Sequence, residues 1–351
     1  MSKKREVVVI IGASAGVGRA AVREFARHGA KIGLIARGRD GLEGARREVE
    51  AAGSEAIVLP TDVADAAQVE AAAEAVEDRF GPIDIWVNVA MTSVFSPIKE
   101  MQPEEYKRVT EVTYLGYVYG TLAALKRMLP RDRGTIVHVG SALGYRSIPL
   151  QSAYCAAKHA VQGFYASLRT ELLHDQSSVK TTIVQMPALN TPQFGWCKSR
   201  LPRKAQPVPP IYQPEVAARA IYYAAHHPEK REYYPAWSSV IAIFGNKLAP
   251  SIGDAYLART GYDSQQYDGR EDPNRPNNLW EPVAGDHGAH GAFDDRAKSW
   301  SSENWFETHP ALFAAMGLGA LAALFGASAS IYRKAKNVSM EDVLPTRRRV
   351  A

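Results

Sequence analysis

Apolar segments and amphipathic segments alternate along the first 250 residues, and this alternation limits the folds open to the chain. Continuous apolar segments are typical of strands buried on both faces, and the amphipathic segments between them are typical of covering helices. Right-handed crossovers between such strands give an α/β fold with a doubly wound parallel sheet of the Rossmann type. The predicted strands are 7–11, 31–36, 56–60, 83–88, 135–139, 181–186 and 232–235, and the predicted helices are 17–29, 40–52, 64–80, 103–129, 152–175 and 214–227.

The alternation ends near residue 250, so we expect one α/β domain over 1–250 and a different organisation beyond it. Residues 261–309 contain ten acidic and four basic residues, with little periodicity and several Asn, Gly and Pro. Such a composition is typical of polar, irregular chain. We therefore predict a polar, partly irregular extension over 251–308.

An uncharged apolar segment follows this extension. The 23 residues 310–332 contain no Asp, Glu, Lys or Arg, and a bilayer core needs about 20 apolar residues. We predict a transmembrane helix over 309–332 and a basic tail over 333–351; a buried helix of a water-soluble protein is the alternative. We do not expect residues 1–11 to be an export signal, because the apolar run 7–11 is too short. We therefore expect membrane association with a cytoplasmic catalytic domain, and leave the topology of the segment open.

Three glycines with the spacing G-x-x-x-G-x-G follow the first predicted strand, at Gly12, Gly16 and Gly18. Glycines at a strand-to-helix turn let the backbone approach a pyrophosphate, and the helix N-terminus favours its negative charge. Together with Ser14 and Val17 of the same loop, they are candidate cofactor-binding residues.

The same loop also matches G-x-S-x-G, the nucleophile elbow of α/β-hydrolases, with Ser14 as the nucleophile. That alternative needs an acid and a histidine downstream, and the chain offers no clear pair. The elbow would also sit on the first strand of the chain, which disfavours this alternative.

The second predicted strand ends at Arg37, where a dinucleotide fold places an acidic residue for NAD or an arginine for the 2′-phosphate of NADP. Arg37 therefore favours NADP over NAD. Asp62 and Val63 follow the third strand, where the carboxylate could approach the adenine amino group. The same aspartate could equally cap the next helix, and the sequence leaves both roles open.

Tyr154 and Lys158 are four residues apart in a predicted helix and therefore share one face. A phenol has a pKa of about 10, and a neighbouring ammonium lowers that pKa by stabilising the phenolate. Ser141 follows an apolar strand and could reach the same site from the strand end. These three residues are candidate catalytic residues.

In combination, the glycine loop and these three residues resemble the short-chain dehydrogenase/reductase family over about residues 5–250. The resemblance implies that Tyr154 is the general acid/base and that Lys158 binds the nicotinamide ribose and lowers the tyrosine pKa. It also implies that Ser141 hydrogen-bonds the substrate oxygen. The reaction would be hydride transfer between NADP(H) and a small carbonyl or secondary alcohol.

Two further segments match the family's cofactor-binding pattern. Pro187 and Thr191 match the segment after the sixth strand, where the threonine holds the nicotinamide carboxamide. Asn88 and Ala90 match the segment after the fourth strand, although Met91 stands where the family usually has glycine.

The long fifth helix departs from the family pattern, because Thr113 stands where many members have a catalytic asparagine. A hydroxyl both donates and accepts hydrogen bonds, so Thr113 could support a water relay to Lys158. We expect an active enzyme. A catalytically weak, NADP-binding membrane adaptor is the alternative from a different functional class.

The remaining expectations concern substrate and partners. Residues 192–214 are expected to form a substrate lid, and the membrane segment favours a lipid-like substrate. The resemblance suggests a dimer or tetramer built on the two longest helices. We expect no nucleic-acid partner and no metal, since the net charge is only +5 and no Cys/His cluster has zinc-ligand spacing. Low-priority candidates for the pocket wall are Phe95, Tyr145 and Trp196.

Overall fold

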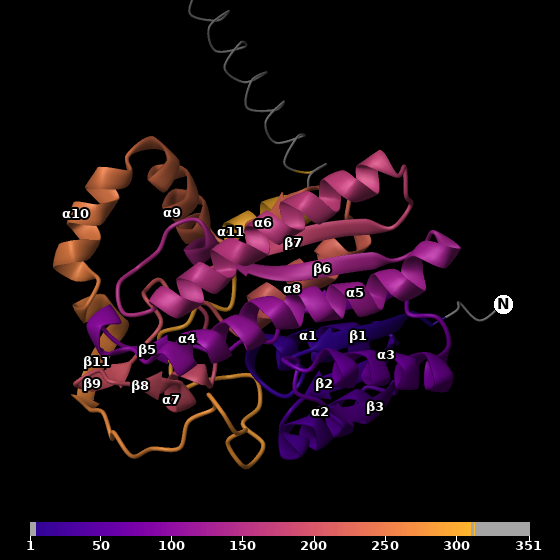
Figure 1. Cartoon of the computed structure of the whole chain (residues 1–351), viewed down its shortest axis with the longest axis horizontal. Coiled ribbons are helices and arrows are strands. Elements are labelled where there is room, and N and C mark those ends of the chain that lie inside the picture. Colours follow the sequence, from indigo (N-terminus) through magenta and orange to yellow (C-terminus); the bar gives the residue numbers. More distant parts are fainter. Residues whose placement is uncertain (1–4, 310–311, 313–351) are drawn as a thin grey trace, which may run out of the picture. The chain divides into compact units, whose positions relative to one another are not determined.

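The computed structural model describes residues 5–309 and 312, and its centre is a seven-stranded parallel sheet (Figure 1). The strand order is β10-β7-β6-β4-β1-β2-β3. The order reverses between β1 and β4, and open α/β sheets bind their ligands at the carboxyl ends of the strands beside such a point. The strands are β1 (Val7–Ile11), β2 (Lys31–Ala36), β3 (Glu55–Pro60), β4 (Ile85–Asn88), β6 (Thr135–Ser141), β7 (Lys180–Met186) and β10 (Glu232–Tyr233).

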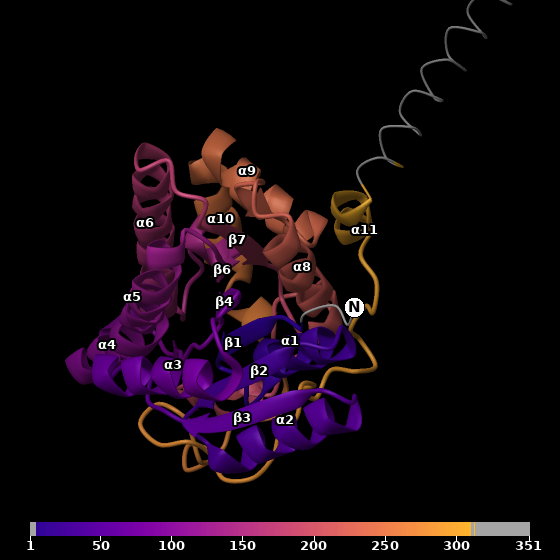
Figure 2. The same ribbon diagram turned by 90° about the vertical axis from the view of Figure 1, so that its right-hand side faces the viewer.

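Helices cover both faces of this sheet, as the sequence predicts (Figure 2). Alternate residues of β1 illustrate the division: Ile10 belongs to one apolar cluster and Ile11 to the other. One face is covered by α1 (Gly16–Arg27), α2 (Arg39–Ala51) and α8 (Pro214–His226). The other face is covered by α3 (Ala66–Phe80), α5 (Gly116–Met128) and α6 (Ser152–His174).

The predicted helix 103–129 is not one regular α-helix. It consists of α4 (Pro103–Thr110), a π-helical turn (Glu111–Leu115) and α5. A π-turn inserts a residue into the helical ladder and is frequent at functional sites. Thr113 lies in this turn, so the departure from α-geometry coincides with the candidate catalytic position.

Short elements complete the carboxyl side of the sheet. Two small sheets pair β5 (Val94–Phe95) with β8 (Lys198–Ser199) and β9 (Arg203–Ala205) with β11 (Gln266–Arg270), and α7 (Gln193–Trp196) lies between β7 and β8 in the chain. Two helices that we did not predict, α9 (Trp237–Leu248) and α10 (Pro250–Thr260), project beyond the sheet (Figure 1).

Residue 250, the expected end of the α/β domain, is not the end of the compact unit, which continues through Asn304. The part of the expected irregular extension that lies within this unit contributes most of α10 and all of β11. Its Asp286 and Asp294 accept hydrogen bonds from Arg19 and Asn190, respectively. A second unit begins at Trp305, and α11 (Ser302–Thr308) ends just before the apolar segment.

The predicted transmembrane helix 309–332 and the basic tail 333–351 fall almost entirely outside the described residues. Among the residues that are described, no helix combines the length and apolarity needed to cross a bilayer.

Candidate active site

A cavity of about 950 Å³ lies at the carboxyl ends of the central strands and contains most of the predicted site residues. It is bordered by the glycine loop after β1, the ends of β6 and β7, the first turns of α6, and α9 and α10. The predicted residues that line it are Gly12, Ser14, Gly16, Val17, Gly18, Arg37, Val63, Ala90, Ser141, Tyr154, Lys158, Pro187, Thr191 and Trp196.

The glycine loop is built by close backbone approaches that exclude side chains. Gly12 has a φ of +97°, and a Cβ there would lie 2.7 Å from the backbone nitrogen of Ala90. A Cβ at Gly18 would lie 2.0 Å from the carbonyl oxygen of Gly12. The loop leads directly into α1, whose N-terminus faces the cavity. This bare backbone at a helix N-terminus fits the pyrophosphate of a dinucleotide.

Arg37 lies where β2 ends, at the cavity wall, as the NADP interpretation requires. Its Nη1 donates to the carbonyl oxygen of Trp280 at 2.6 Å and its Nη2 to that of Asn278 at 2.5 Å. Burial lowers the pKa of Arg37, and the neighbouring Arg108 cation lowers it further. In the described part of the chain, its hydrogen-bond partners are carbonyls rather than carboxylates. The Arg37 guanidinium is therefore suited to bind an anionic ligand.

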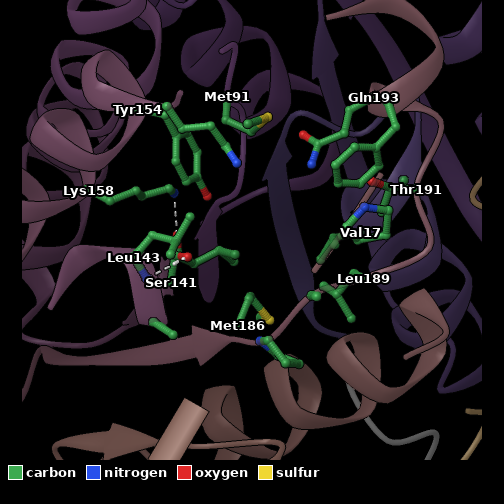
Figure 3. Close-up of a pocket in the computed structure, with 18 of the residues that line it drawn as sticks. Val17, Met91, Ser141, Leu143, Tyr154, Lys158, Met186, Leu189, Thr191 and Gln193 are labelled. Atoms are coloured by element: carbon green, nitrogen blue, oxygen red, sulfur yellow. Dashed lines mark hydrogen bonds between the residues drawn. The ribbon is translucent and has the colours of Figure 1, made fainter. Parts of the chain in front are cut away.

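Ser141, Tyr154 and Lys158 meet at one side of the cavity (Figure 3). Ser141 is the last residue of β6, and its Oγ accepts a hydrogen bond from the backbone nitrogen of Leu143 at 3.1 Å. Tyr154 and Lys158 lie one turn apart near the start of α6, and Lys158 Nζ is 5.7 Å from the Tyr154 ring centroid. Val17, Leu189 and Thr191 line the opposite side (Figure 3).

The titration of this group differs from the expectation that Lys158 lowers the tyrosine pKa. Burial raises the pKa of Tyr154, and hydrogen bonding to Ser141 opposes this rise only in part. Burial also lowers the pKa of Lys158 to about 7. Lys158 Nζ donates to Val139 O at 2.7 Å and to Tyr117 Oη at 2.9 Å. The amino group of Lys158 is therefore hydrogen-bonded to groups other than the Tyr154 hydroxyl. It is only partly protonated at neutral pH.

The Thr113 hydroxyl, which we expected to support a water relay to Lys158, is hydrogen-bonded to the backbone of Thr92. The Thr113 hydroxyl accepts from the backbone nitrogen of Thr92 at 3.0 Å and donates to the backbone oxygen of Thr92 at 2.9 Å. Tyr117, one turn further along the same helix, contacts Lys158 instead. Sequence reasoning missed Tyr117 because the π-turn changes which residues of this helix face the site.

Two expected cofactor-binding side chains are engaged elsewhere. Asn88 is fully buried: its Oδ1 accepts from Trp86 Nε1 at 3.0 Å, and its Nδ2 donates to Thr121 Oγ1 at 3.1 Å. Asp62 pairs with Arg108 at 2.6 Å and accepts from a backbone nitrogen two residues ahead. Asn88 therefore links α5 to β4. The N-cap of α3 is Asp65, so Asp62 does not have the helix-capping role that the sequence left open.

The pocket-wall expectations hold for Trp196 alone. Phe95 is buried in a separate apolar cluster, and the Tyr145 hydroxyl donates to both carboxylate oxygens of Glu232, at 2.8 and 2.7 Å. Residues of α9 and α10, including Ile241 and Ile252, line the cavity instead. The apolar residues of these two helices recur with helical periodicity in the sequence, and this pattern could have indicated them.

Comparison with known proteins defines the class. The family model for short chain dehydrogenases matches residues 6–198. The chain therefore belongs to the short-chain dehydrogenase/reductase family, as the sequence motifs predicted. This membership does not favour the hydrolase alternative built on Ser14.

Individual relatives extend the comparison. A Bacillus subtilis protein named uncharacterized oxidoreductase YxnA is 34% identical over 286 residues, which cover 81% of this chain and 80% of that protein. The 3-dehydrosphinganine reductase of Danio rerio is 32% identical over 222 residues, or 61% of this chain and 66% of that protein. An alcohol dehydrogenase of the archaeon Thermococcus sibiricus, solved with 5-hydroxy-NADP, superposes with a TM-score of 0.56 and 28% identity, covering 66% of this chain and 95% of that one.

Proposed function

We propose that this protein is an NADP(H)-dependent oxidoreductase that interconverts a carbonyl compound and a secondary alcohol. The observation that carries the proposal is the position of Ser141, Tyr154 and Lys158 on one wall of the cavity that the glycine loop enters. When bound, the nicotinamide supplies or accepts the hydride. The protein's own residues supply the proton and hold the reacting oxygen.

Each of the three residues has a distinct role in this proposal. The Tyr154 hydroxyl donates a proton to the carbonyl oxygen during reduction and takes it back during oxidation. Ser141, whose hydroxyl lies at the end of β6, orients that oxygen by hydrogen bonding. Lys158, in its charged form, would bind the ribose. Ser141 and Lys158 are buried, which strengthens their electrostatic interactions.

The cofactor assignment rests on Arg37 and the glycine loop. Gly12, Gly16 and Gly18 would admit the pyrophosphate, and Arg37 would bind the 2′-phosphate that distinguishes NADP from NAD. Pro187 and Thr191 line the cavity where the nicotinamide would lie. The archaeal alcohol dehydrogenase that superposes on this chain was solved with 5-hydroxy-NADP, which supports the same choice.

We propose an apolar, lipid-like substrate. Ile241 and Ile252 are 69% and 73% exposed and also line the cavity, so the mouth of the site is apolar. The relative named 3-dehydrosphinganine reductase acts, by its name, on 3-dehydrosphinganine. The uncharged segment 310–332 would hold the enzyme at a membrane, with the catalytic unit on the cytoplasmic side. Assembly into a dimer or tetramer through α5 and α6 remains part of the proposal.

The test is a substrate screen with the full chain, followed by NADPH absorbance, together with the variant Tyr154→Phe. We expect turnover of apolar ketones or aldehydes by the native protein. The variant should lose at least about a thousandfold in kcat because it has no proton to donate, while binding NADPH as before. Native protein that binds NADPH but reduces no carbonyl across the screen would support the adaptor alternative.

A further inference from the structure

The chain from 277 to 291, here called the strap, borders the cofactor end of the cavity, although it lies far from the glycine loop in sequence. Asn278, Pro282, Val283, Gly285 and His287 of the strap line the cavity. In Figure 1 this orange segment passes beside α2, and Figure 2 shows it from a second side. The strap thus forms a wall of the site that the family's motifs do not include.

The first part of the strap holds two arginines through consecutive carbonyl groups. The oxygens of Asn278 and Trp280 accept from Arg37, and the oxygen of Leu279 accepts from Arg108 Nε at 3.1 Å. The Leu279 side chain is fully buried, which fixes the three carbonyls in place. Among the described residues, Arg37 uses two of its five N–H donors, both on the strap, which leaves three for a ligand.

The second part of the strap is anchored on α1 and α2. Asp286 accepts from both Nη atoms of Arg19, at 3.0 and 3.2 Å, and Arg19 is almost fully buried. The backbone nitrogen of Gly285 donates to Asp40 Oδ2 at 2.9 Å. A Cβ at Gly44 would lie 1.9 Å from Asp286 Oδ2, so only glycine leaves room for this carboxylate.

The last part of the strap closes on the cofactor loops themselves. The backbone nitrogen of Gly16 donates to the carbonyl oxygen of Gly288 at 3.0 Å. Gly291 packs against Thr191, where a Cβ would lie 2.4 Å from the threonine carbonyl oxygen. The strap therefore contacts the phosphate-binding loop, the arginine at the end of β2 and the predicted nicotinamide segment.

We propose that the strap positions Arg37 and thereby sets the preference of this enzyme for NADP over NAD. An unrestrained arginine side chain loses rotamer entropy when it is fixed, and its planar fork binds phosphate best when it is already oriented. The two strap carbonyls orient this fork in advance. NAD lacks the 2′-phosphate, so its binding gains nothing from the arrangement. This inference rests on the proposed use of NADP.

The experiment measures dissociation constants for NADPH and NADH by calorimetry on the full chain. Leu279→Ala removes the buried anchor of the Arg37-binding carbonyls without changing a cavity residue. We expect the NADPH Kd to rise about tenfold and the NADH Kd by less than about twofold. Leu168→Ala is the matched control: it truncates a buried leucine of α6, away from the strap, and should change neither Kd.

A double-mutant cycle with Arg37→Met tests whether the strap acts through this arginine. In the Arg37→Met background, Leu279→Ala should no longer weaken NADPH binding. Equal losses for both cofactors, or a loss of NADPH binding that persists in that background, would overturn the proposal. So would a native protein that binds NADH as tightly as NADPH. If Leu279→Ala does not fold, Asp286→Asn, which breaks the ion pair with Arg19, replaces it.

These outcomes are separate from those that test the proposed reaction. The strap experiment reads cofactor binding alone, so a protein that binds NADPH selectively and reduces no carbonyl would refute the reaction and leave the strap proposal standing. An active enzyme that has no preference for NADPH over NADH would refute the strap proposal and leave the proposed reaction standing.

Discussion

The ammonium of Lys158 donates to the hydroxyl of Tyr117 at 2.9 Å, and both side chains are buried. This contact joins α6 to α5 beneath the active site. The Tyr117 hydroxyl in turn donates to the carbonyl oxygen of Val139, at the end of β6. Tyr117 is therefore a positioning residue for Lys158. It lies in the helix in which many family members have a catalytic asparagine.

Tyr117→Phe should lower kcat about tenfold, because it removes one hydrogen-bond acceptor from the buried ammonium. The loss of that acceptor should also move the pKa of Lys158 further below its present value of about 7. The charged form of Lys158 would then be lost at lower pH, and the alkaline fall of carbonyl reduction should shift to lower pH. A pH–kcat profile measures this shift.

A purely structural role for Tyr117 would give a different result. The melting temperature would fall, while the pH–kcat profile kept its shape and position. Thr113→Val is the matched control, because Thr113 bonds to the backbone of Thr92 and not to Lys158. This variant should lose stability without moving the profile.

Much of this site could be predicted from the sequence, because its residues are set by local patterns. The strands β1 and β2 have the predicted bounds, and Ser141, Tyr154 and Lys158 line one cavity. What could not be predicted depends on contacts between distant segments. The contact between Arg37 and Trp280 joins residues 243 positions apart, and no periodicity or motif encodes it.

His138 lies fully buried in β6, and neither ring nitrogen has a hydrogen-bond partner among the described residues. Burial and, to a smaller extent, the nearby Lys158 charge together lower the pKa of His138 to about 3. The unfolded chain binds the proton near pH 6.5 whereas the folded chain resists it down to about pH 3. The folded state therefore loses stability as the pH falls through this window.

His138→Phe should reduce that acid sensitivity. Between pH 7 and pH 5 the native protein should lose about 2 kcal/mol of unfolding free energy through this group, and the variant should not. Urea unfolding at the two pH values measures the difference. Replacing the exposed His174 by glutamine is the control. A variant as acid-sensitive as the native chain would contradict the assignment.

Gly18→Ala should abolish cofactor binding, because its Cβ would lie 2.0 Å from the carbonyl oxygen of Gly12. The loop would have to move away from the position that admits a pyrophosphate. Gly163→Ala is the matched control in α6, where a Cβ meets nothing within 4 Å. That variant should bind NADPH normally and gain about 0.5–1 kcal/mol of stability from better helix propensity. Calorimetric titration with NADPH and thermal melting separate the two effects; normal NADPH binding by Gly18→Ala would contradict the loop's role.

Two exposed residues of the α9–α10 region test the apolar mouth of the site. Ile252 is 73% exposed and lines the cavity, whereas Leu248 is 87% exposed and does not line it. Ile252→Glu places a carboxylate where an apolar substrate would enter, so KM for a long-chain ketone should rise about tenfold while kcat changes little. Leu248→Glu introduces the same charge at the end of the neighbouring helix α9 and should leave KM within about twofold. Equal effects of the two variants would show that general surface apolarity, rather than the cavity mouth, governs substrate capture.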